Sequence, residues 1–187
     1  VPVAEIINTS LKQLNNVQKD LINFGWRGWE GILPATIIRD CSSNSSLVQD
    51  TIAYFNEVLL TSVHRLHPLT CYYHRDSRPN KFAGSALTGV QPYMGSELPD
   101  LTGNIIFTDF ARIESGSPAR GVLAYTTIRT DCKLNDYGII ETDYNFGSRD
   151  AFYVSLGSNY SQTKLYLGVY GSANVTDLNQ GTIFEIV

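Results

Sequence analysis

Hydrophobic and polar positions alternate along the second half of the chain. β-branched and aromatic residues recur at every second position, and short clusters of Gly, Asn, Asp and Ser separate the runs. No segment of helical length lies between one run and the next, which favours an antiparallel meander over a parallel sheet. The pattern predicts six strands, at residues 103–112, 119–132, 137–145, 150–156, 163–171 and 181–187.

The first third of the chain has a helical spacing of apolar residues instead. Residues 3–23 place them three and four positions apart, and Gly25 follows as a helix stop. Residues 47–66 repeat the pattern, with Ser46 as N-cap and Pro68 as terminator. We therefore predict an α+β, mainly β fold. An antiparallel meander forms a barrel or strongly curved sheet, and two amphipathic helices pack on it.

The length of 187 residues suits one domain, residues 1–187. It divides into a helix-rich part (1–74), a long loop (75–102) and the β-meander (103–187). Loops as long as 75–102 are usually binding loops or lids, or else contain unrecognised strands. We expect residues 82–98 to cover the open mouth of the barrel.

Neighbouring residues on a strand point to opposite faces of a sheet. Two sets of alternating apolar residues are therefore predicted to point inward: Phe152, Val154 and Leu156, and Leu165, Leu167 and Val169. Three tyrosines are predicted to point outward: Tyr153, Tyr166 and Tyr170. Small barrels can enclose one ligand, and we expect an apolar pocket here, lined by Trp26, Trp29, Tyr125, Phe152, Val154 and Leu167.

Charge and motifs narrow the classes of function. A net charge of −4 and a pI near 5.3 do not fit the basic patch that nucleic-acid binding requires, so no nucleic-acid partner is expected. No apolar run approaches 18 residues, and no membrane span is predicted. The chain lacks a Gly-x-Ser-x-Gly motif, a phosphate-binding glycine loop and a His-Glu-x-x-His motif. We expect no cofactor and no enzyme activity.

The chain has features of an extracellular, secreted glycoprotein. It opens Val1-Pro2-Val3, which resembles a processed terminus. Asn-x-Ser/Thr motifs predict glycosylation at four positions: Asn8, Asn44, Asn159 and Asn174.

Three cysteines allow one disulfide and leave one cysteine over. The alternative is three reduced cysteines in the core of a cytosolic protein. Any pair among Cys41, Cys71 and Cys132 is a candidate disulfide. The remaining thiol either packs in the core or joins two chains as a homodimer.

All three histidines, His64, His67 and His74, lie close together in the sequence. Histidines three apart on a helix can share a metal, but Pro68 interrupts the helix, and no metal site is predicted. In an alternative hypothesis, one of these histidines is the base of a hydrolase.

The segment Thr142-Asp143-Tyr144 follows an apolar run and precedes the predicted strand Ala151–Leu156. It resembles the Thr-Asp-Tyr signature of the lipocalins, and the likeness covers about 50 residues. The resemblance implies a cup-shaped barrel that carries a small apolar ligand, with Asp143 and Tyr144 in structural roles.

Three hypotheses for function follow. In the first, the protein is a secreted transport protein that binds a small apolar ligand in a barrel-like cavity. In the second, it is an extracellular interaction, glycan-binding or structural and storage protein without a small-molecule pocket. The third is the hydrolase.

Overall fold

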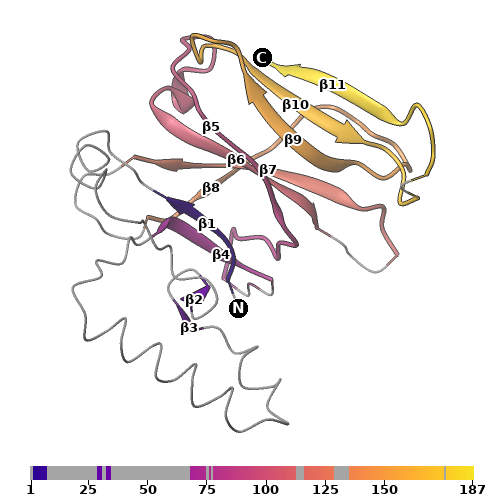
Figure 1. The fold of residues 1–187 in the computed structure, drawn as a ribbon, viewed down its shortest axis with the longest axis horizontal. Helices are drawn as coiled ribbons and strands as arrows, with labels where there is room; N and C mark the ends of the chain where they lie inside the picture. The colour runs from indigo at the N-terminus through magenta and orange to yellow at the C-terminus, as the bar shows by residue number, and fades with distance from the viewer. Residues whose placement is uncertain are drawn as a thin grey trace, which may run out of the picture.

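Two antiparallel β-sheets form the body of the protein (Figure 1). The structure is a computed structural model that describes residues 2–7, 29–30, 33–34, 68–74, 76, 78–112, 116–128, 135–174 and 176–187. The first sheet has four strands in sequence order: β5 (Leu87–Pro92), β6 (Asn104–Arg112), β7 (Arg120–Thr127) and β8 (Gly138–Ile140). The second has three strands: β9 (Phe152–Ser158), β10 (Leu165–Tyr170) and β11 (Gly181–Ile186).

Two smaller ribbons complete the described strands. β1 (Pro2–Ile7) pairs antiparallel with β4 (Pro68–Tyr73), and β2 (Trp29–Glu30) pairs with β3 (Leu33–Pro34). A single 3₁₀ turn, η1 (Pro99–Leu101), precedes β6. None of the helices among these residues is long and apolar enough to cross a membrane.

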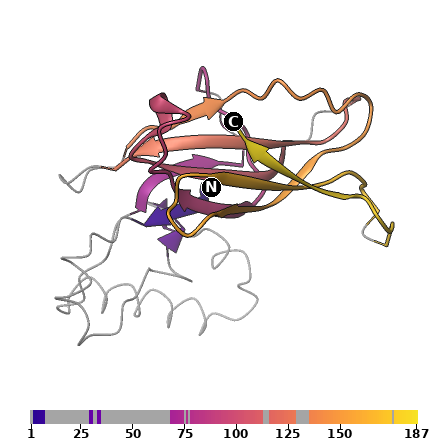
Figure 2. The ribbon, with the colours of Figure 1, turned by 90° about the horizontal axis from the view of Figure 1, so that it is seen from above.

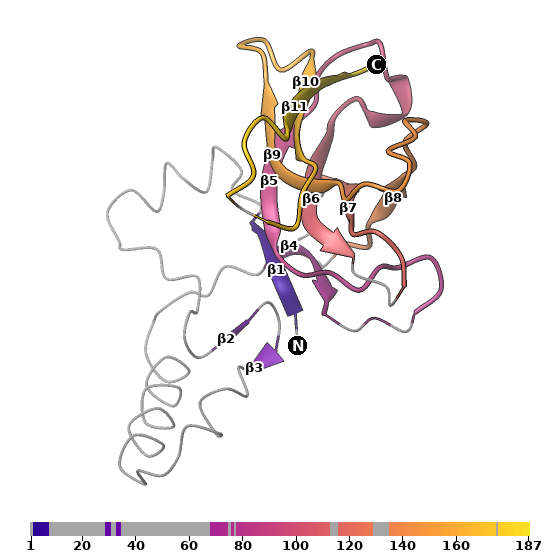
Figure 3. The same cartoon turned by 90° about the vertical axis from the view of Figure 1, so that its right-hand side faces the viewer.

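The two sheets pack face to face, because β9 lies across β5, β6 and β7 (Figure 2 and Figure 3). β9 approaches β5 closely at Gly89, where a Cβ atom would lie 2.5 Å from Leu156 Cβ. Thr88 Oγ1 donates a 2.7 Å hydrogen bond to the Tyr153 carbonyl there. Buried residues of both sheets fill the space between them, including Ile106, Leu123, Leu156, Leu165, Leu167 and Val169.

The four-stranded sheet is buried on its other face as well. Phe107 and Ala124 point away from the three-stranded sheet and pack against Leu69 and Tyr72 of β4. The sheet is therefore a middle layer. Burial on both faces explains why β6 and β7 contain continuous apolar runs rather than strict alternation.

The prediction of two packed helices is wrong for the described chain, which contains no α-helix. The first predicted helix, 3–23, begins as strand β1, and its residues 8–23 lie outside the described residues. Val3, Ile6 and Ile7 are β-branched and suit a strand as well as a helix, and pairing with β4 decides the outcome. The second predicted helix, 47–66, lies outside the described residues.

The predicted barrel is also wrong: among the described strands, β8 and β11 each have one hydrogen-bonded neighbour and the sheet does not close. The meander divides instead, because residues 141–150 leave β8 after only three residues and lead to a separate sheet. Asp, Asn and Gly in this segment favour turns over strands. β5 lies within the long predicted loop, which therefore contains an unrecognised strand.

The inward direction of β10 is confirmed, since Leu165, Leu167 and Val169 are all buried. On β9 the prediction holds for Phe152 and Leu156 but is wrong for Val154, which is 43% exposed. The β9–β10 register shifts between Gly168 and Val169, leaving Val154 without a partner. Such a bulge changes the faces of the residues around it, and so Tyr153, predicted to point outward, is buried.

Candidate functional site

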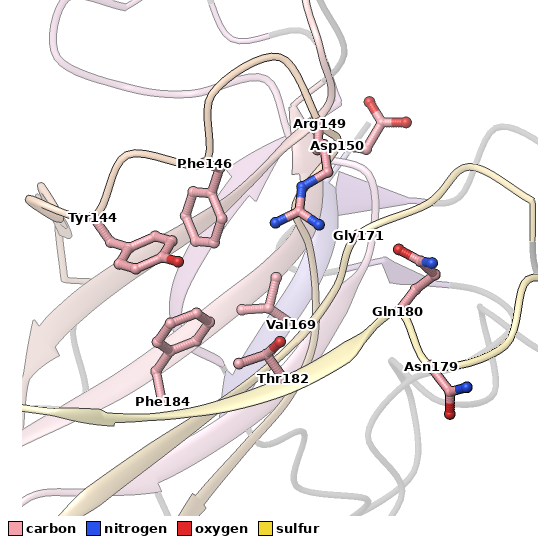
Figure 4. A pocket seen from close by; sticks show the side chains of 10 residues that line it. All are labelled: Tyr144, Phe146, Arg149, Asp150, Val169, Gly171, Asn179, Gln180, Thr182 and Phe184. Atoms are coloured by element: carbon pink, nitrogen blue, oxygen red, sulfur yellow. The ribbon is translucent and has the colours of Figure 1, made fainter.

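A surface cleft lies where the loop 141–150 meets the edge of the three-stranded sheet (Figure 4). Its volume is about 80 Å³. Side chains from the loop, from β10 and from the end of the β10–β11 turn and β11 line it: Tyr144, Phe146, Arg149, Asp150, Val169, Asn179, Gln180, Thr182 and Phe184. We call it the aromatic cleft.

Three aromatic rings form one side of the cleft. The Tyr144 ring centroid lies 4.7 Å from both the Phe146 and the Phe184 centroids. Phe146 and Phe184 are half-buried, whereas Tyr144 is 56% exposed. Phe184 is placed by β11, whose register sets it opposite the buried Leu167. The exposed Tyr144 ring of the cleft is therefore supported by the half-buried rings of Phe146 and Phe184.

Polar side chains form the other side (Figure 4). Arg149 points its guanidinium toward the cleft, and this group has no hydrogen-bond or ion-pair partner among the described residues. Gln180 and Asp150 are half-buried beside it, and Asn179 is exposed with a φ of 59°. Guanidinium and amide groups together can donate and accept hydrogen bonds to a polar ligand, whereas the Asp150 carboxylate points away from the cleft.

The loop that carries these residues is fixed to the start of β7. Arg120 donates hydrogen bonds to the carbonyls of Arg149 (2.6 Å) and Gly147 (2.7 Å). Asp150 Oδ1 accepts from the Ala119 amide at 2.8 Å. Gly147 has a φ of 62°, a conformation that glycine adopts without strain. The cleft geometry is therefore held in place by main-chain contacts.

A second hollow of about 240 Å³ is lined by residues of the same loop and of β7 and β8. Tyr144 and Phe146 line both spaces. Apolar residues of β7 and β8 contribute to this hollow, and Arg112, Arg120 and Glu141 supply charge. Tyr153 also lines it, and burial raises the pKa of its hydroxyl. Both hollows are smaller than the roughly 300–1,000 Å³ typical of sites that enclose a drug-sized ligand.

A buried polar cluster lies on the other face of the middle sheet, around Asp109. Asp109 is fully buried, and its carboxylate accepts hydrogen bonds from the Tyr72 hydroxyl (2.8 Å), the Ala86 amide (2.9 Å) and the Ala111 amide (3.1 Å). Ser85 adds its amide and its hydroxyl. Burial raises the pKa of the Asp109 carboxyl, and the donated hydrogen bonds oppose that rise.

The same surroundings raise the pKa of Tyr72, through burial and the adjacent carboxylate. This cluster joins β4, β6 and the 84–86 segment, and a ligand has no access to it. We interpret it as structural.

The residues of the predicted apolar pocket lie in different places. Phe152 packs with Ala111 and Ala119, and Leu167 belongs to the core between the two sheets. Val154 is exposed, and Tyr125 is half-buried at the core edge. Trp29 is on β2, and Trp26 lies outside the described residues.

The other candidate residues are only partly placed. His74 is exposed, and its Nδ1 lies 3.1 Å from the Gly84 carbonyl. Cys71 is buried on β4. Six other candidates lie outside the described residues: Asn8, Asn44, Cys41, Cys132, His64 and His67. In the described chain no three His, Cys, Asp or Glu residues are arranged to hold a metal.

Sequence reasoning missed the residues of the aromatic cleft. The lipocalin resemblance implies a structural role for Tyr144 and predicts no role for Phe146, Arg149 or Phe184. One signal was available: Tyr144 and Phe146 are large aromatic residues in a segment otherwise composed of turn-forming residues. Nothing in the sequence indicates that Phe184 belongs to a binding site, since an aromatic residue is common on a strand.

Comparison with known proteins gives no match: no family model, no curated protein and no solved structure is detectably similar to this chain.

Proposed function

We propose that this protein is an extracellular binding protein that recognises glycans at the aromatic cleft. One observation carries the proposal. An exposed Tyr144 ring, supported by Phe146 and Phe184, faces the Arg149 guanidinium, which has no partner among the described residues, across a shallow surface cleft.

Sugars combine two surfaces that match this arrangement. The C–H face of a pyranose ring is apolar and stacks on an aromatic ring, while the hydroxyl edges exchange hydrogen bonds with amide, carboxylate and guanidinium groups. In the cleft, Tyr144 supplies the ring, and Arg149 and Gln180 lie on the polar side.

The size of the cleft favours recognition of part of a longer chain. A space of about 80 Å³ holds roughly two or three water molecules, since a water occupies about 30 Å³. A glycan would therefore lie along the surface and insert a single substituent. The four Asn-x-Ser/Thr motifs support secretion, and the extracellular space is where such ligands occur.

The apolar-carrier hypothesis has less support, because it requires a closed barrel and the described strands do not form one.

The proposal is tested by screening the purified full chain on an array of immobilised glycans, with binding to the best hit then quantified by calorimetry. Tyr144→Ala should weaken that binding at least tenfold, which corresponds to a loss of about 1.4 kcal/mol. Arg149→Gln should also weaken it.

Tyr160→Ala is the matched control. Tyr160 is a fully exposed tyrosine in the β9–β10 turn, and it does not line the cleft. Its replacement should leave binding unchanged. An array without a hit, or equal losses for Tyr144→Ala and Tyr160→Ala, would contradict the proposal.

A further inference from the structure

The asparagines of two of the four Asn-x-Ser/Thr motifs, Asn159 and Asn174, lie in the described chain, and their side chains make different hydrogen bonds. Asn174 is exposed in the β10–β11 turn. Its Oδ1 accepts hydrogen bonds from the Thr176 amide (3.2 Å) and the Thr176 hydroxyl (2.9 Å). Its Nδ2 donates to Asp177 Oδ1 at 2.8 Å. One of the two amide hydrogens is therefore without a partner among the described residues.

The turn around Asn174 is held by other groups as well. The Tyr170 hydroxyl contacts the carbonyls of Asn174 (2.9 Å) and Asp177 (2.7 Å). Ser172 Oγ donates to Asp177 Oδ2 at 2.6 Å. The conformation of this turn does not depend on the second amide hydrogen of Asn174.

At Asn159, in contrast to Asn174, both amide hydrogens have hydrogen-bond partners. Asn159 is half-buried in the β9–β10 turn, and its Nδ2 donates to both Ser161 Oγ (3.1 Å) and Thr163 Oγ1 (2.9 Å). Its Oδ1 accepts from the amides of Thr163 (2.8 Å) and Lys164 (3.0 Å). The side chain therefore uses all its hydrogen-bonding capacity to hold the turn.

The β9–β10 turn is also packed against another segment. The Met94 amide donates to the Gln162 carbonyl at 2.7 Å. A Cβ atom on Gly95 would collide with the Thr163 carbonyl. Little room for rearrangement remains around Asn159.

We propose that Asn174 carries an N-linked glycan in the folded protein and that Asn159 does not. In the transfer, Asn174 Nδ2 forms a bond to the anomeric carbon of a sugar supplied by a lipid-linked diphospho-oligosaccharide. The bond from that carbon to the diphosphate oxygen breaks, the lipid diphosphate leaves with the electron pair, and Nδ2 loses one proton to the solvent.

The linked nitrogen keeps one N–H group. At Asn174 one N–H is enough for the bond to Asp177. At Asn159 a glycan removes one of two hydrogen bonds that hold a packed turn, so chains modified there fold poorly and are depleted from the secreted protein.

The test is site-resolved mapping of glycan occupancy on the full chain, fused to a secretion signal and recovered from the medium of eukaryotic cells. Enzymatic deglycosylation in ¹⁸O-water marks each occupied Asn for mass spectrometry. The Asn174 peptide should be marked in most molecules and the Asn159 peptide in few. Thr176→Ala, which keeps Asn174 but removes its motif, should abolish the mark at 174. Ser161→Ala should leave the pattern unchanged.

A companion measurement on the cell lysate follows chains before secretion. If Asn159 is modified in the lysate and depleted in the medium, the proposed folding defect is supported. An unmodified Asn174, or an Asn159 occupied as fully as Asn174 in the secreted protein, would overturn the proposal. Neither result depends on whether the aromatic cleft binds glycans.

Discussion

The Asp109 cluster and the aromatic cleft are both built from aromatic and polar side chains, but they use them in opposite ways. Around Asp109, the carboxylate is fully buried and accepts every nearby donor. In the cleft, Arg149 is exposed without a described partner, and Tyr144 is more than half exposed. Groups that are satisfied internally stabilise the fold, whereas groups that are positioned but unsatisfied are available to a ligand.

The largest effect is expected from Asp109→Asn. The amide must place an NH₂ group where the carboxylate now accepts from the Ser85, Ala86 and Ala111 amides, so donors face donors in either orientation. Each buried donor left without an acceptor typically costs about 1–3 kcal/mol, and here both the new NH₂ group and the backbone amide that it faces are left without one. Urea denaturation should show a loss of this size in the free energy of unfolding.

Asp143→Asn is the control for that variant, because Asp143 is exposed in the 141–150 loop. It should change stability by less than about 0.5 kcal/mol. If the two substitutions had equal effects, Asp109 would not have the structural role assigned to it.

A somewhat smaller effect is expected from Gly89→Ala. Its Cβ would lie 2.5 Å from Leu156 Cβ and 2.6 Å from the Leu156 backbone nitrogen, so β9 must move away from β5. Overpacking of this kind costs about 1–3 kcal/mol. Gly157, three residues from the bulge of β9 at Val154, has no atom near the corresponding position. Thermal denaturation should show a clear loss for Gly89→Ala and almost none for Gly157→Ala.

Some strands and their buried faces could be predicted from the sequence, and others could not. The alternation of Leu165, Leu167 and Val169 predicted β10 and its buried face correctly, because period-2 burial is a local signal. The bulge at Val154 could not be predicted, since it depends on pairing with β10. The strand β1 could not be predicted either, because it depends on pairing with β4, which lies more than 60 residues away in the sequence.

The candidate site was harder to predict than the strands. Tyr144 and Phe184 are 40 positions apart and meet only because the meander divides into two sheets. Aromatic residues on strands usually fill a core, so sequence reasoning chose Phe152 and Leu167 instead. Those two side chains lie in separate buried clusters.

Two tyrosines of one aromatic cluster should respond differently to loss of the hydroxyl. The rings of Tyr72 and Tyr137 lie 6.2 Å apart. The Tyr72 hydroxyl donates to Asp109, and Tyr72→Phe should cost about 1–2 kcal/mol. The Tyr137 hydroxyl is buried and makes no hydrogen bond of normal geometry with the described residues, and burial raises its pKa to about 12. Tyr137→Phe should be neutral or stabilise by up to about 1 kcal/mol. Equal losses in chemical denaturation would show that Tyr137 has a hydrogen bond in solution.

The smallest effect on stability is expected at the cleft itself. Tyr144 contacts Phe146 and Phe184, and an aromatic pair contributes about 0.5–1.5 kcal/mol when it is well buried. Because the Tyr144 ring is 56% exposed, Tyr144→Ala should cost less than about 1 kcal/mol in urea denaturation, close to the value for the exposed Tyr160→Ala. The lipocalin resemblance implies a structural Tyr144 instead, for which a loss of about 3–5 kcal/mol is typical of a buried aromatic residue. A loss of about 3–5 kcal/mol in the free energy of unfolding would show that Tyr144 mainly stabilises the fold. A small loss together with weakened glycan binding would show that Tyr144 acts in recognition.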